Sequence, residues 1–98
     1  MRKIIVAGNW KMNLEFEEAK TLVDSLNNLD LTVGGLDKVL IFPPFPYLKP
    51  LMDLKLKAKI GLGAQNVSSE EKGAFTGEVS AKMLSSIGIE YTLIGHSE

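Results

Sequence analysis

Residues 4–11 of this 98-residue chain read IIVAGNWK, and their pattern is the first sign of its fold class. Residues 4–7 are β-branched or small and continuously apolar, a pattern typical of a parallel strand that is covered on both faces. Gly8 is expected to end the strand, and a polar turn follows. We therefore predict a buried first strand that delivers polar side chains to one end of a sheet.

The same apolar pattern recurs three more times, at residues 39–42, 59–65 and 91–95, with helical segments between the repeats. The first helix is expected to start at an Asn13 cap and to carry an apolar stripe from Phe16 to Leu29. The second, residues 46–54, contains Pro50 and is expected to be short or to begin late. The third covers residues 81–87, between a Ser80 cap and Gly88. The order βαβαβαβ predicts a single α/β domain with four parallel strands in the order 1-2-3-4.

Composition narrows the function classes. The chain has no Cys, which excludes disulfides and thiolate catalysis, and its net charge of -1 gives no reason to expect a nucleic-acid or membrane partner. Lys55, Lys57 and Lys59 are interpreted as a solvated connection and not as a basic patch. The apolar run at residues 4–7 is too short for a signal peptide or a membrane span, so the cytoplasm is the expected location.

Polar side chains gather where the predicted strands end, which is where parallel sheets bind ligands. Lys11 is either an anion-binding cation or an exposed surface lysine. His96, the only histidine in the sequence, is either an acid–base group or a structural hydrogen-bonding residue. Both readings remain open from residue type and position alone.

Several other chemistries are not supported. The neighbours His96, Ser97 and Glu98 cannot form a hydrolase triad, because that geometry is assembled from distant segments. Gly61-x-Gly63 lacks the third glycine of a dinucleotide fingerprint, and one His without Cys disfavours a transition-metal centre. We expect no cofactor and no metal.

Four motifs in register carry a family resemblance: GNWKMN (residues 8–13), GAQN (63–66), GAFTGE (73–78) and IGHSE (94–98). Together they resemble the triosephosphate isomerases. The resemblance implies a partial (β/α)8 TIM barrel, with residues 1–98 forming an N-terminal half-barrel segment of about four of the eight units and the helices on its outer face. It also implies the glycolytic and gluconeogenic interconversion of dihydroxyacetone phosphate and glyceraldehyde 3-phosphate.

The resemblance also assigns roles to residues. Asn9 and Lys11 would bind the substrate, and His96 would act as the electrophile beside Lys11. Glu98 would pair with Lys11, and Ser97 would support the same site. A homodimer interface would include four further residues: Gln65, Phe75, Thr76 and Glu78.

The family's glutamate base, lid and phosphate loop would lie beyond residue 98. We therefore expect negligible turnover from these 98 residues alone, and an exposed concave face that pairs with a C-terminal complement or self-associates. The alternative function is a non-catalytic, self-assembling half-barrel. A third reading, a flavodoxin-like phosphate binder, would need helices on both faces of the sheet and a switch point in the strand order.

Overall fold

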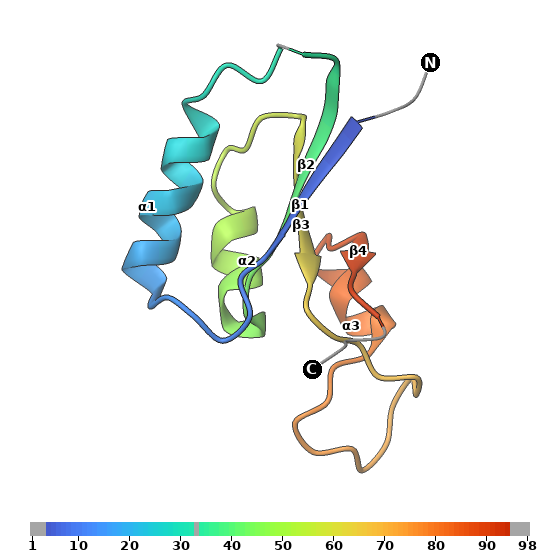
Figure 1. Cartoon of the computed structure of the whole chain (residues 1–98). Helices are drawn as coiled ribbons and strands as arrows, with labels where there is room; N and C mark the ends of the chain where they lie inside the picture. The colour runs from blue at the N-terminus through green and yellow to red at the C-terminus, as the bar shows by residue number, and fades with distance from the viewer. Residues whose placement is uncertain (1–3, 33, 95–98) are drawn as a thin grey trace.

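The computed structural model describes residues 4–32 and 34–94, in which strands and helices alternate (Figure 1). The elements are β1 (Ile4–Asn9), α1 (Phe16–Asn27), β2 (Leu36–Phe42), α2 (Phe45–Met52), β3 (Ile60–Ala64), α3 (Ala81–Ser86) and β4 (Tyr91–Thr92). The predicted βαβαβαβ order is confirmed. Within this part of the chain, no helix is long and apolar enough to cross a membrane.

The described strands form one parallel sheet in the order β1-β2-β3-β4. The register pairs Ala7 with Leu40 and Leu40 with Gly61, so these three residues lie on one face of the sheet. Consecutive order without a switch point confirms the predicted fold class, a partial TIM barrel. It also removes the flavodoxin-like alternative.

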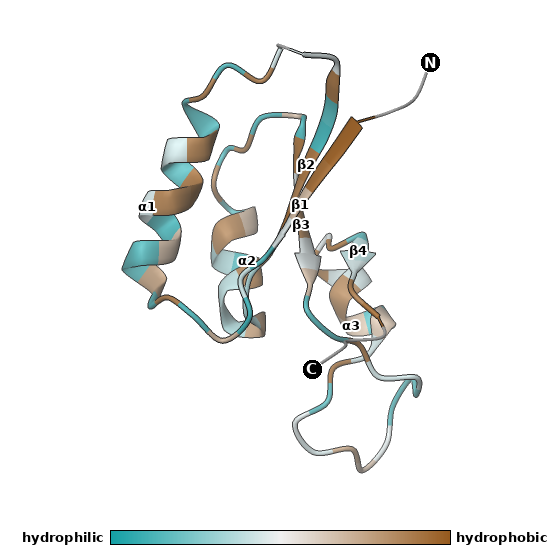
Figure 2. Ribbon diagram, in the orientation of Figure 1, coloured by the Kyte–Doolittle hydropathy of each residue, from teal (hydrophilic) through white to brown (hydrophobic). Residues whose placement is uncertain are grey.

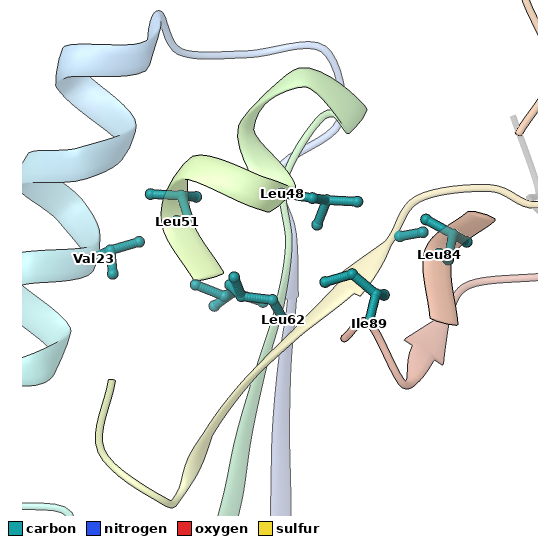
Figure 3. Packing of buried hydrophobic residues seen from close by; sticks show 8 residues of the cluster. Val23, Leu48, Leu51, Leu62, Leu84 and Ile89 are labelled. Atoms are coloured by element: carbon teal, nitrogen blue, oxygen red, sulfur yellow. The ribbon is translucent and has the colours of Figure 1, made fainter. Parts of the chain in front are cut away.

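The helices of the described chain contribute to one hydrophobic core. Figure 3 shows this cluster, whose buried members are Val23, Ile41, Leu48, Leu51, Leu62, Ala64, Leu84 and Ile89. They come from α1, α2, α3, the segment after α3, and one face of β2 and β3. The opposite face, which carries Leu40, Gly61 and Tyr91, receives no helix from the described residues. This arrangement matches helices on the outer face of a half-barrel.

The prediction of a buried first strand was wrong for this chain. Ile5 is 55% exposed and Val6 is 53% exposed, and Figure 2 shows the first half of β1 in brown at the edge of the sheet. The physical reason is that, among the described strands, β1 pairs with β2 alone, while α1 packs mainly against α2. The apolar side chains of β1 are therefore left exposed, because residues 4–32 and 34–94 provide no further strand or helix to cover them.

The start of α1 also differs from the prediction. The helix is capped at Glu15, whose backbone N–H donates to Glu18 Oε1 at 3.1 Å, as in a capping box. Asn13 does not cap it; its Nδ2 donates to the Trp10 carbonyl at 2.9 Å. Of the expected apolar stripe, Ala19 and Val23 are buried, whereas Leu29 lies beyond the helix end and is exposed.

The other helices follow the expected local chemistry more closely. α2 contains Pro50 and is only eight residues long, so the expectation of a short helix is confirmed. In α3 the Ser80 hydroxyl accepts the Met83 N–H at 3.2 Å, which confirms the predicted cap. Gly88, at φ +89°, follows the end of that helix with a backbone conformation that favours glycine.

Candidate active site

The strands β1, β2 and β3 are parallel, so their carboxyl ends lie side by side at the same end of the sheet. Asn9 is paired in register with Phe42, and the Trp10 N–H continues the ladder by donating to the Phe42 carbonyl at 3.2 Å. Gln65 follows β3 directly, and its side chain contacts Lys11 and Phe42. Segments more than fifty residues apart in the sequence are thereby brought together.

Side chains hold the backbone of Lys11 on both sides. Its N–H donates to Asn9 Oδ1 at 2.9 Å, while Gln65 Nε2 donates to the Lys11 carbonyl at 2.7 Å. The same Gln65 nitrogen donates to the Phe42 carbonyl at 2.8 Å. Lys11 is therefore fixed relative to the ends of β1, β2 and β3, so its ammonium starts from a defined backbone position.

The β1–α1 loop (residues 10–15) contains two non-glycine residues in the left-handed region. Lys11 has φ 57° and Leu14 has φ 72°. Each such residue costs roughly 1–2 kcal/mol, a strain that persists only where surrounding contacts impose it. Such strain is concentrated at functional sites in proteins, and here one of the two strained residues is the candidate phosphate-binding lysine.

The site offers a cation and amide groups. Lys11 is exposed, as a residue that meets a soluble anion must be, and the Asn9 side chain lies beside it. Among the described residues there is no group of three or more His, Cys, Asp and Glu that could hold a metal ion. The chemistry of these groups suits an anionic, oxygen-rich small molecule such as a phosphate ester.

Three of the predicted site residues, Asn9, Lys11 and Gln65, lie together in the structure. His96, Ser97 and Glu98 lie outside the described residues, so their roles stay predictions. The remaining predicted interface residues lie in the β3–α3 loop (residues 65–80), which projects away from the sheet in Figure 1.

Phe75, Thr76 and Glu78 are exposed there, and Phe75 keeps 49% of its surface. The Phe75 ring packs over Gly73, where an added Cβ would lie 2.7 Å from a ring carbon. An exposed aromatic ring held against its own loop is compatible with the predicted interface, whose role stays a prediction.

Sequence reasoning missed what Gln65 does within its own chain. It was expected only at a strand end and at the dimer interface, yet its amide joins β2 to the β1–α1 loop. A side-chain amide directly after a strand was the available signal, because it offers two N–H donors at the sheet edge. Tyr47, whose hydroxyl donates to the Leu14 carbonyl at 2.9 Å, gave no signal in the sequence.

Comparison with known proteins decides the family. Residues 4–98 match the family model described as triosephosphate isomerase. The chain belongs to the triosephosphate isomerase family. The strand-end cluster of Asn9, Lys11 and Gln65 is thus part of a triosephosphate isomerase fold.

Individual triosephosphate isomerases are close in sequence. The chain is 48% identical to the enzyme of that name from Dehalococcoides mccartyi, and the match covers all of this chain and 38% of the relative. It is 48% identical to the Carboxydothermus hydrogenoformans protein and 47% identical to the Bacteroides fragilis protein, each covered over 39% of its length. The chain therefore spans less than two-fifths of the length of these relatives.

Proposed function

We propose that these residues supply the substrate-binding and electrophilic part of a triosephosphate isomerase site. The reaction is the interconversion of dihydroxyacetone phosphate and glyceraldehyde 3-phosphate, a step of glycolysis and gluconeogenesis in the cytoplasm. The observation that carries the proposal is Lys11, fixed at the strand ends by Asn9 and Gln65. Membership of the family supports the same assignment.

In the proposed mechanism, Lys11 and Asn9 bind the triose phosphate. The Lys11 ammonium attracts the phosphate and stabilises negative charge that develops on the carbonyl oxygen. His96, by resemblance, donates a hydrogen bond to that oxygen and moves protons between the two oxygens of the enediol. Glu98 and Ser97 complete this side of the site, and no metal or cofactor is needed for proton transfer of this kind.

The enediol forms when a base removes a carbon-bound proton, and the reaction ends when that base returns a proton to the neighbouring carbon. The resemblance assigns that base to a glutamate in the part of the family's length that this chain does not span, together with the lid and the phosphate loop. We infer that the 98 residues alone polarise the substrate without completing the isomerisation. Turnover would then require the C-terminal complement.

A chimera tests this proposal. Residues 1–98 are joined to the part of the Dehalococcoides mccartyi relative that the match does not cover, and isomerisation is followed in a coupled assay. We expect the chimera to turn over and the 98-residue chain alone to show negligible activity. An inactive, folded chimera, or a chain that works alone at the rate of the chimera, would count against the proposal.

We also propose that the family's homodimer forms through the β3–α3 loop, with Phe75, Thr76, Glu78 and Gln65 at the contact. The exposure of Phe75 on a projecting loop supports this, because an aromatic side chain in that position is typical of interface anchors. Sedimentation of the chimera checks it. Phe75→Ser should shift the distribution toward monomer, and an unchanged dimer would contradict this assignment.

The second candidate function is a non-catalytic half-barrel that self-assembles. The exposed side chains of Ile5 and Val6 and the sheet face without a described helix favour it, because apolar surface of this kind promotes association. Size-exclusion chromatography of the 98-residue chain separates the two only together with the activity of the chimera, because the fragment of an isomerase would also expose this face. A defined oligomer, together with an inactive chimera, would favour this candidate over the isomerase.

A further inference from the structure

The hydroxyl group of Tyr47 links α2 to the C-terminal end of the β1–α1 loop. Tyr47 OH donates to the Leu14 carbonyl at 2.9 Å, across 33 residues of sequence. The Tyr47 ring also packs against Phe16 in the first turn of α1, with the ring centroids 5.7 Å apart. One side chain of α2 therefore contacts both the last part of the loop and the helix that follows it.

This contact falls where the loop is strained. Leu14 has φ 72°, a conformation that a branched side chain rarely adopts unless its surroundings impose it. At the other end of the loop, Lys11 has φ 57° and its carbonyl accepts from Gln65. Each left-handed residue thus has its carbonyl held by a side chain from a different element, Gln65 after β3 and Tyr47 in α2.

We propose that Tyr47 is a positioning residue for Lys11, acting through the Leu14 carbonyl. The inference rests on the proposed isomerase function, and Tyr47 itself does not touch the substrate. With Lys11 and Leu14 both restrained, the two residues between them keep one path, so the ammonium is presented in a fixed place. Without the hydroxyl, Leu14 can relax toward an ordinary conformation, and the backbone of Lys11 can follow it.

The test is Tyr47→Phe in the full-length chimera, because this change removes only the hydroxyl and keeps the ring contact with Phe16. The matched control is Ser25→Ala, which removes a hydroxyl that donates to the Thr21 carbonyl at 3.1 Å within α1, away from the loop. Melting temperature, kcat, KM and competitive inhibition by inorganic phosphate are measured for both variants.

We expect kcat/KM of Tyr47→Phe to fall about 10-fold and its inhibition by inorganic phosphate to weaken in parallel, because a small displacement of a positioned group is costly in a catalytic site. Its melting temperature should stay close to that of Ser25→Ala, whose kinetics should match the parent chimera. This separates positioning from a general loss of stability.

The contrary outcomes are distinct. An active chimera whose Tyr47→Phe variant keeps its kcat/KM and phosphate inhibition, or does not fold at all, would show that the hydroxyl is only structural and would overturn this inference alone. A folded parent chimera without isomerase activity would instead overturn the proposed function, and this inference with it.

Discussion

Replacing Gly63 with alanine tests the packing on the sheet face that carries Leu40, Gly61 and Tyr91. A Cβ at this position would lie 2.6 Å from one ring carbon of Phe42, closer still to a second one, and 3.0 Å from the Tyr91 Cβ. Carbon atoms pack at about 3.5–4.0 Å, so the Phe42 ring would have to move by roughly 1 Å or more. That ring is 4% exposed and has little room to move. The packing therefore opposes any side chain at residue 63.

Overpacking of this kind costs typically about 1–3 kcal/mol. For a chain of this size, each kcal/mol lowers the melting temperature by about 4–8 °C. Gly63→Ala should thus lower it by roughly 4–24 °C. Gly8→Ala is the matched control, because it also lies in a strand and its Cβ would meet no atom within 4 Å.

The assay is thermal unfolding of the 98-residue chain, followed by circular dichroism for the parent and both variants. Gly8→Ala should melt at or slightly above the parent temperature, since alanine restricts the unfolded chain. Equal melting temperatures for the two alanine variants would contradict this prediction, because they would show that the Phe42 ring does not occupy the space beside Gly63.

Two further changes test local interactions by the same unfolding assay. Ser80→Ala removes the α3 cap and should destabilise the chain by about 0.5–2 kcal/mol. An unchanged melting temperature would contradict the capping hydrogen bond from the Met83 N–H to the Ser80 hydroxyl. Hydrogen bonds from the Thr32 hydroxyl and N–H, helped by Lys57 and Lys59, hold the pKa of Asp30 below its ordinary value. The folded-state pKa is lowered, so this carboxylate stabilises the fold above the ordinary Asp pKa, and the contribution is lost as the pH falls through the lowered value. Asp30→Asn should therefore melt below the parent at pH 7, with a gap that narrows below about pH 4; a gap that does not depend on pH would contradict the shift.

Much of the fold could be predicted from local sequence patterns, because strands and helices here carry distinct periodicities. The start of β2 was missed since Asp37 and Lys38 interrupt the apolar run, yet both lie in the strand. Asp37 accepts the Ile4 N–H at 2.8 Å, and Lys38 Nζ reaches the Ala58 carbonyl at 3.0 Å. Polar residues with such distant partners cannot be assigned to a strand from local sequence alone.

The candidate site was predictable in part for a different reason. Parallel strands place their carboxyl ends at one edge, so Asn9, Lys11 and Gln65 could be expected there from topology. The hydrogen bonds that fix the β1–α1 loop could not be predicted in this way. The Tyr47 hydroxyl reaches Leu14 only after α2 has packed beside the loop, and the left-handed φ of Leu14 breaks the preference of its own residue type.

The proposed function depends on Lys11, which would bind and polarise a triose phosphate at the strand ends. The most direct measurement is kcat/KM for glyceraldehyde 3-phosphate in the chimera, comparing Lys11→Met with Lys20→Met, an exposed lysine of α1. We expect a loss of at least about 100-fold for Lys11→Met, the scale of removing a positioned electrostatic group, and little change for Lys20→Met. A folded Lys11→Met chimera that keeps the kcat/KM of the Lys20→Met control would contradict it.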